Sequence, residues 1–171
     1  MKQASLRVWL TFLFALGLGV LLHFLYDWFP HPLVALISPV RESIWEHLKV
    51  MFYPLFLSGL FLGGKRGLTP WLFSLLTVCG LMLLIGWLYN VALQGTADLF
   101  NILLYGVLML LGFLLPRIVW SLTEWPGIGA ACAILTVLLI TLMIIFTYAP
   151  PGNILFQDLS GGARTFLTIP V

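Results

Sequence analysis

The amino-acid sequence predicts an all-α integral membrane protein: one bundle of five transmembrane helices formed by the whole of residues 1–171. Two observations predict this class. Hydrophobic residues make up 61% of the chain and charged residues only 8%, whereas soluble domains carry about 25% charged residues. The apolar residues also form long segments, and a helix needs about 20 of them to cross roughly 30 Å of hydrocarbon. The lipid bilayer is therefore the expected partner of most of this surface.

Five apolar segments define the predicted helices. They span about residues 7–29, 39–63, 70–92, 98–115 and 127–148, and a tail of 149–171 follows. Prolines on both sides of His31 end the first helix, because consecutive prolines cannot continue it. The second is expected to begin at Ser38-Pro39, an N-cap residue followed by proline in the first helical position. Asp98 is expected to cap the fourth helix, and Pro116 to follow its end.

Small residues indicate where helices approach each other. Gly59 and Gly63 form a GxxxG pair, which allows close contact between membrane helices. Gly19 leaves room for a neighbour on the first helix. The connections are short, so consecutive helices are expected to be antiparallel. Other small-residue faces suit further membrane subunits or a homo-oligomer.

Lysine and arginine residues predict the orientation of the bundle. Five crossings place five of them on the side of the N-terminus: Lys2, Arg7, Lys65, Arg66 and Arg117. The other side holds three: Arg41, Lys49 and Arg164. The positive-inside rule then predicts a cytoplasmic N-terminus and an extracytoplasmic C-terminal tail. A net charge of +2 without a basic run excludes nucleic acid as a partner.

Ionisable and polar side chains gather at the predicted extracytoplasmic end. His23 and Asp27 lie one helical turn apart on the first helix. The apolar part of the second helix, residues 50–62, would be only about 20 Å long, so its preceding charged turns must enter the membrane or pair with neighbours. We therefore predict an outward-facing polar pocket with further donors on the later helices. Its members are His23, Asp27, Glu42, Glu46 and His47, with Asn90, Asn101 and Tyr148 as outer hydrogen-bond donors.

Three kinds of function fit such a pocket, because ionisable groups at membrane depth are costly and need a partner. The first is one divalent metal ion such as zinc, whose bound water would hydrolyse an outer-leaflet or extracytoplasmic substrate. Its ligands would be His23, Asp27, Glu46 and His47. The second is proton sharing between Glu42 and Glu46 in a proton-coupled carrier component.

The third kind is a structural network, in which Lys49 neutralises Glu46 at i+3. The chain carries no HExxH or GxSxG signature of a hydrolase. It also has no internal repeat of the kind that self-contained carriers show. The sequence therefore favours a non-catalytic structural or partner subunit, and the metal-dependent hydrolase and the carrier component are the alternatives.

Several motifs resemble a known family. They are His23-Phe-Leu-Tyr-Asp27-Trp28, Ser38-Pro-x-x-Glu42-Ser43-x-Trp45-Glu46-His47-Leu-Lys49, Tyr148-Ala-Pro-Pro151 and Leu155-Phe156-Gln-Asp158. Together they are similar to a family of small bacterial multi-pass membrane proteins, catalogued as domain of unknown function 6512. The resemblance implies a helical bundle in a bacterial inner or plasma membrane. It implies no reaction.

Overall fold

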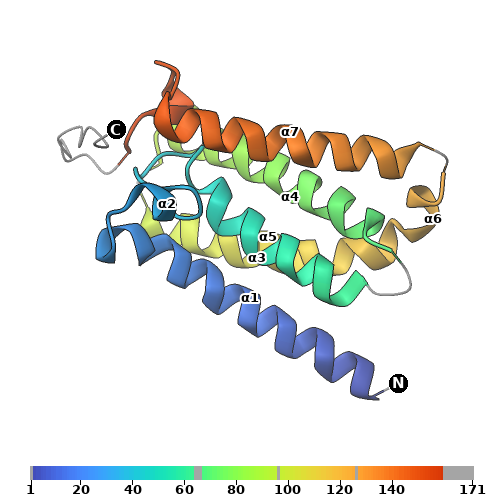
Figure 1. The fold of residues 1–171 in the computed structure, drawn as a ribbon. Helices are drawn as coiled ribbons and strands as arrows, with labels where there is room; N and C mark the ends of the chain where they lie inside the picture. The colour runs from blue at the N-terminus through green and yellow to red at the C-terminus, as the bar shows by residue number, and fades with distance from the viewer. Residues whose placement is uncertain (1, 64–66, 96, 126, 160–171) are drawn as a thin grey trace.

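The protein is described here by a computed structural model that covers residues 2–63, 67–95, 97–125 and 127–159. Over these residues every regular element is a helix (Figure 1). The elements are α1 (Lys2–Trp28), α2 (Pro32–Ala35), α3 (Leu48–Gly63), α4 (Thr69–Trp87), the π-helix η2 (Leu88–Ala92), α5 (Asp98–Ile118), α6 (Trp120–Thr123), α7 (Ile128–Tyr148) and the 3-10 helix η3 (Ile154–Phe156).

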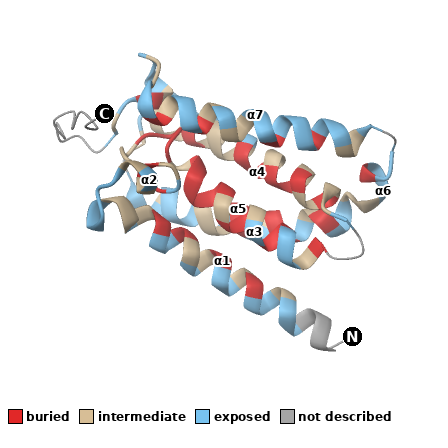
Figure 2. Ribbon diagram, in the orientation of Figure 1, coloured by how far each residue is buried: buried red, intermediate tan, exposed pale blue. Residues whose placement is uncertain are grey.

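The long helices run from end to end of one bundle. α1, α4 and α7 point one way, and α3 and α5 point the other way (Figure 1). Buried residues gather on α3 and α4, whereas α1 and α7 expose most of their surface (Figure 2). Four helical segments are long and apolar enough to cross a membrane: Leu6–Trp28, Thr69–Ala92, Asp98–Ile118 and Ile128–Tyr148. The chain is therefore a multi-pass membrane protein, and α3, with 16 residues, is the shorter apolar helix among them.

The predicted start of the second helix is wrong. Ser38-Pro39 does not begin a helix, and residues 38–47 form bends and turns before α3 begins at Leu48. Ser38 does not cap a helix, because its hydroxyl bonds to backbone groups of α1 instead. The Ser43 hydroxyl accepts a hydrogen bond from the backbone N–H of Glu46 at 3.2 Å, within the turn that precedes α3. Glu42 and Glu46 therefore lie in a folded insert, and they do not share one face of a helix.

The boundaries of α5 also differ from the prediction. Asp98 lies in the first turn and Ala97 is the N-cap residue, without a side-chain capping bond. Pro116 lies inside the helix, which continues to Ile118. A proline at this position deprives the carbonyl of Gly112 of its helical donor. The hydroxyl of Ser74 on α4 donates to that carbonyl at 2.8 Å, so a neighbouring helix satisfies the group that the proline frees.

Glycines mark the close contacts, as the sequence predicted. A Cβ on Gly19 would collide with the hydroxyl of Tyr105 on α5 and lie 3.0 Å from the carbonyl oxygen of Val50 on α3. That hydroxyl donates to the backbone carbonyl of Leu16 at 3.2 Å. A Cβ on Gly59 would lie 2.8 Å from the Cβ of Trp71 on α4. The contact at Gly19 holds the outer half of α1 against the bundle.

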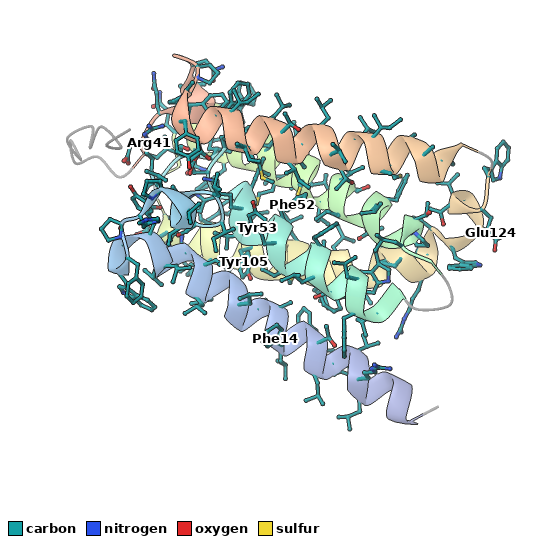
Figure 3. The ribbon with its side chains drawn as sticks, viewed as in Figure 1. Phe14, Arg41, Phe52, Tyr53, Tyr105 and Glu124 are labelled. Carbon is teal, nitrogen blue, oxygen red and sulfur yellow. The ribbon has the colours of Figure 1, made fainter. Side chains whose placement is uncertain are left out.

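The charged residues that the structure describes lie in two groups, one at each end of the bundle. Figure 3 shows Arg41 at one end and Glu124 at the other. Arg7 lies near the N-terminus of α1 and Arg117 in the last turn of α5, at the same end of the bundle as Glu124. Lys65, Arg66 and Arg164, on which the predicted orientation also rests, lie outside the described residues.

Candidate metal centre

The end of the bundle at which α1 ends and α3 begins contains a folded insert, which we define as residues 29–47. It connects α1 to α3 and includes the short helix α2, whose N-cap residue is the exposed His31. Backbone at membrane depth needs hydrogen-bond partners from the protein. Side chains from two helices provide them: Tyr53 on α3 donates to the carbonyl of Leu36 at 2.8 Å, and Tyr148 on α7 donates to that of Pro32 at 2.9 Å.

A closed ion pair forms the base of the insert. The ammonium of Lys49 donates to a carboxylate oxygen of Glu46 at 2.6 Å, and to the carbonyls of Ala35 at 2.7 Å and Ser38 at 3.3 Å. The same carboxylate oxygen accepts the N–H of Val40 at 3.0 Å. Lys49 is 0% exposed and Glu46 is 2% exposed. This closed pair therefore binds the two halves of the insert to α3.

Ser38 attaches the insert to α1. Its buried hydroxyl donates to the carbonyl of Leu22 at 2.6 Å and accepts the N–H of Tyr26 at 2.9 Å. These two backbone groups are the acceptor and donor of one i→i−4 pair of a helix. The hydroxyl therefore bridges the turn of α1 that carries His23, and it fixes that turn relative to the insert.

Above the closed pair lies a second, open cluster, which we define as His23, Glu42 and His47. One ligand atom from each side chain lies within 4.8 Å of the other two. The Nε2 atom of His47 lies 3.3 Å from Oε2 of Glu42, and the Nε2 atom of His23 lies 4.0 Å from Oε1. The three side chains are 28–29% exposed, so water reaches them.

Hydrogen bonding orients the imidazole of His47. Its Nδ1 atom lies 2.7 Å from the carbonyl oxygen of Ser43. A carbonyl only accepts, so Nδ1 carries the proton and Nε2 faces the carboxylate of Glu42. Metal-binding histidines have this same arrangement, in which the second ring nitrogen donates to a carbonyl or a carboxylate.

The surroundings of His47 favour positive charge. Burial lowers its pKa and is the largest single influence. The hydrogen bonds with Glu42 and Ser43, together with the negative charges of Glu42 and Glu46, act in the opposite direction and raise the pKa of His47 above its ordinary value. The ring of His47 therefore holds a second proton more readily than a free imidazole does.

The described part of the C-terminal tail packs against the insert. The backbone N–H of Trp45 donates to the carbonyl of Leu155 at 3.1 Å, and that of Leu159 donates to the carbonyl of Glu42 at 2.9 Å. The ring of Phe156 lies 5.2 Å from the ring of Trp45. Two backbone hydrogen bonds and an aromatic contact thus hold the segment from which Glu42 and His47 project.

The structure gathers only some of the predicted pocket. His23 and His47 come together, and Glu42 joins them in the position that the sequence analysis gave to Glu46. Glu46 pairs with Lys49, and Asp27 lies outside the group of three. The capping pattern Ser43-x-x-Glu46 would have placed the two glutamates in a turn, where they point to different partners.

The three predicted outer donors, Asn90, Asn101 and Tyr148, form hydrogen bonds away from this cluster. Asn90 and Asn101 face each other, with Nδ2 of Asn90 3.4 Å from Oδ1 of Asn101. Tyr148 holds the insert through Pro32, as described above. These three residues therefore support the outer end of the bundle in other places.

A helical membrane bundle with a water-accessible His-Glu-His cluster at one end is the class of protein that these features define. The chain belongs to the family described as a family of unknown function (DUF6512), which matches it over residues 2–165. The predicted resemblance is thereby confirmed. No curated protein and no solved structure matches the chain.

Proposed function

We propose that this protein is a membrane metalloprotein that holds one divalent cation, zinc by its ligand set, between His23, Glu42 and His47. The observation that carries the proposal is the convergence of these three ligand atoms within 4.8 Å. Tetrahedral zinc with bonds of about 2.0–2.1 Å separates its ligand atoms by about 3.3 Å. The Nε2 atom of His47 lies 3.3 Å from Oε2 of Glu42, which equals this separation. The Nε2 atom of His23 lies 4.0 Å from the other oxygen, Oε1, so this side chain would have to move closer to complete the set.

The ligand set indicates a reactive site. Two histidines and one glutamate are the protein ligands of several hydrolytic zinc enzymes, whereas structural zinc sites have four. A bound ion would keep one position open for water, and the partial exposure of all three side chains allows a substrate to reach it. Zinc lowers the pKa of such a water to about 7, which makes it a nucleophile toward an ester, amide or phosphate. The substrate is then an outer-leaflet or extracytoplasmic molecule.

This proposal takes precedence over a purely structural or partner role for the pocket. The predicted neutralisation of Glu46 by Lys49 is confirmed, since the two form a buried ion pair at 2.6 Å, but this pair does not include Glu42 or the two histidines. The negative charge of Glu42 instead faces two imidazoles. A divalent cation would satisfy all three groups at once.

We also propose that α3 is a fifth crossing and that the N-terminus is cytoplasmic. α1 and α4 run in the same direction, so the chain must return between them, and α3 is the helix that does so. Its 16 residues measure about 24 Å, short of the roughly 30 Å of hydrocarbon. The insert, with its satisfied backbone, fills the remaining depth.

Cysteine labelling in intact cells tests this topology. In a chain without Cys79 and Cys132, an impermeant reagent should label Leu33→Cys and leave Leu122→Cys unlabelled; both native residues are exposed. Labelling of both positions would mean that α3 does not cross. Labelling of Leu122→Cys alone would reverse the orientation.

Metal analysis of the protein, purified in detergent without chelator, tests the centre itself. We expect about one zinc per chain in the wild type and in Asp27→Asn, a control on the same helix one turn from His23. His23→Ala should lose the metal. Wild-type protein without stoichiometric metal, or equal metal loss in both variants, would refute the proposed ligand set.

Hydrolysis is assayed separately on the metal-loaded protein. The wild type should cleave a panel of ester, amide and phosphate amphiphiles in mixed micelles, and His47→Ala should not. A protein that binds zinc but cleaves nothing would limit the function to metal binding.

A further inference from the structure

A crevice lies between α1 and α5, at the opposite end of the bundle from the metal centre. It encloses a cavity of about 80 Å³. Its lining combines apolar side chains with one cation: Val8, Trp9 and Phe12 from α1, and Leu110, Phe113, Leu114 and Arg117 from α5. In Figure 1, α1 diverges from the other helices toward its N-terminus, which is the part of α1 that lines the crevice.

The inner wall of the crevice is a chain of aromatic contacts. Phe12 meets Phe113 edge to face, with ring centroids 5.3 Å apart, and Phe113 meets Trp71 in the same way at 5.4 Å. Trp9 continues the chain through Phe12 at 5.8 Å. Edge-to-face packing fixes these rings. The crevice is therefore a preformed apolar trough, which needs no rearrangement to receive an acyl chain.

Arg117 stands at the end of this trough, in the last turn of α5. Leu110, Leu114 and Arg117 follow one another at i, i+4 and i+7, so the guanidinium continues the apolar stripe. Arg117 is exposed, and it forms no ion pair with the residues that the structure describes. Trp9, which lines the same crevice, is 56% exposed and carries an indole N–H donor.

We propose that this crevice binds one anionic phospholipid, with an acyl chain in the trough and the phosphate on Arg117. The apolar walls and the terminal cation match the two parts of such a lipid. A guanidinium binds phosphate oxygens in pairs, and the indole of Trp9 offers a further donor at the level of the headgroups. Basic pockets between membrane helices on the cytoplasmic side bind anionic lipid headgroups in the same way.

The dimensions of the crevice favour a lipid over a partner helix. A helix with its side chains is about 10–12 Å wide, which is too wide for a cavity of about 80 Å³. A cavity of this volume has room for part of an acyl chain. The outward side of α1, where Phe14 points away from the bundle (Figure 3), is a separate surface.

Native mass spectrometry of the full-length protein in detergent tests the proposal. Phosphatidylglycerol and phosphatidylcholine with identical acyl chains are added in equal amounts, and the lipid retained on the protein is counted. We expect one phosphatidylglycerol per chain to bind in preference to phosphatidylcholine, and Arg117→Gln to reduce that preference about fivefold. The matched control is Arg7→Gln, an exposed cation at the same end whose guanidinium lies over the ring of Phe61 on α3.

A second variant tests the trough separately from the charge. Leu114→Trp fills the space beside Arg117 and should displace the lipid while keeping the cation; Leu114 is 45% exposed, so the larger ring does not disturb the core. Glycerol phosphate, which has the headgroup charge without the chains, should not compete. Equal losses in Arg7→Gln and Arg117→Gln, or competition by glycerol phosphate, would refute the proposed lipid site. A lipid-free dimer that Leu114→Trp dissociates would assign the crevice to a second copy instead.

Discussion

Two clusters of charged residues lie within one stretch of 27 residues, yet they have opposite character. Glu46 and Lys49 are almost wholly buried, and their pair closes on three backbone carbonyl and amide partners. His23, Glu42 and His47 are nearly 30% exposed, and their ligand atoms converge on one point. The closed pair holds the insert in place, and the insert in turn positions Glu42 and His47 of the open cluster beside His23.

The difference shows why an ion pair at membrane depth is not by itself a functional site. A buried pair is favourable only where further hydrogen bonds satisfy it, and the Lys49 ammonium satisfies two carbonyls of the insert. The role of the pair is therefore structural, because it provides hydrogen bonds to backbone carbonyls of the insert. Glu42, four residues before Glu46, faces imidazoles that accept either a proton or a metal ion. The two glutamates have separate roles because a turn, and not a helix, lies between them.

The largest effect is expected from removing the cation of the closed pair. Lys49→Met leaves the carbonyls of Ala35 and Ser38 without the ammonium donor, and it leaves the Glu46 carboxylate with only the N–H of Val40. Loss of one partner of a buried pair costs about 3–5 kcal/mol, so the unfolding transition in detergent should fall sharply. The double variant Lys49→Met/Glu46→Gln should recover part of this loss. A Lys49→Met protein that melts like the wild type would show that the pair does not hold the insert.

A sharper test compares Glu42 with Glu46, because substitution of the first should affect zinc binding and substitution of the second should affect stability. Glu42→Gln should weaken zinc binding by at least about 10–100-fold, the cost of losing even an outer partner of a metal ligand, and should change stability little. Glu46→Gln should lower stability and leave the affinity for zinc within a few-fold of the wild type. Zinc titration measures the affinity of both variants, and thermal unfolding measures their stability. Equal effects of both substitutions on metal binding would mean that the clusters form one site.

The long helices were predictable from the sequence, because hydropathy and proline positions set their limits. The predicted 70–92 and 127–148 correspond to Thr69–Ala92 and Ile128–Tyr148. Gly19 was also interpreted correctly as the site of a close neighbour. These features depend on the hydropathy and the size of residues along the sequence, so they can be predicted without knowledge of distant contacts.

The insert was not predictable to the same degree. Two capping signals compete there, Ser38-Pro39 and Ser43-x-x-Glu46; only the second forms its hydrogen bond, and it does so in the turn before α3 begins at Leu48. The first serine acts in another way, as the bridge to α1. Contacts across 12 to 16 residues decide between the two signals, and such contacts leave no periodic pattern. Glu42, and not Glu46, joins the two histidines for the same reason, since a turn in place of a helix separates the two carboxylates.

The position of His23 depends on the close approach of α1 at Gly19. Gly19→Ala places a methyl group against the hydroxyl of Tyr105 and the carbonyl of Val50, and such overpacking costs about 1–3 kcal/mol. Gly17→Ala is the control on the same helix, because nothing lies within 4 Å of its added Cβ. Thermal unfolding should separate the two variants, and Tyr105→Phe should partly rescue Gly19→Ala. A similar melting point for both alanine variants would mean that α1 does not depend on this contact.

The smallest effect on stability is expected at Ser38, where the insert meets α1. In Ser38→Ala, the carbonyl of Leu22 and the N–H of Tyr26 lose the bridging hydroxyl. These two groups are four residues apart in one helix, so they can bond to each other, and the net loss should be near the typical value of about 1 kcal/mol for one hydrogen bond. Closing that turn moves His23 relative to the insert, which should reduce zinc affinity by a measurable factor.

Ser58→Ala provides the matched control for Ser38→Ala. Ser58 is equally buried, but its hydroxyl donates to the carbonyl of Pro54 within its own helix. Its loss should cost similar stability and leave the affinity for zinc unchanged. A loss of about 3 kcal/mol or more in Ser38→Ala would mean that the two backbone groups remain unsatisfied. Equal zinc affinities of the two variants would separate the bridge from the metal centre, because the turn that carries His23 would then keep its place without the Ser38 hydroxyl.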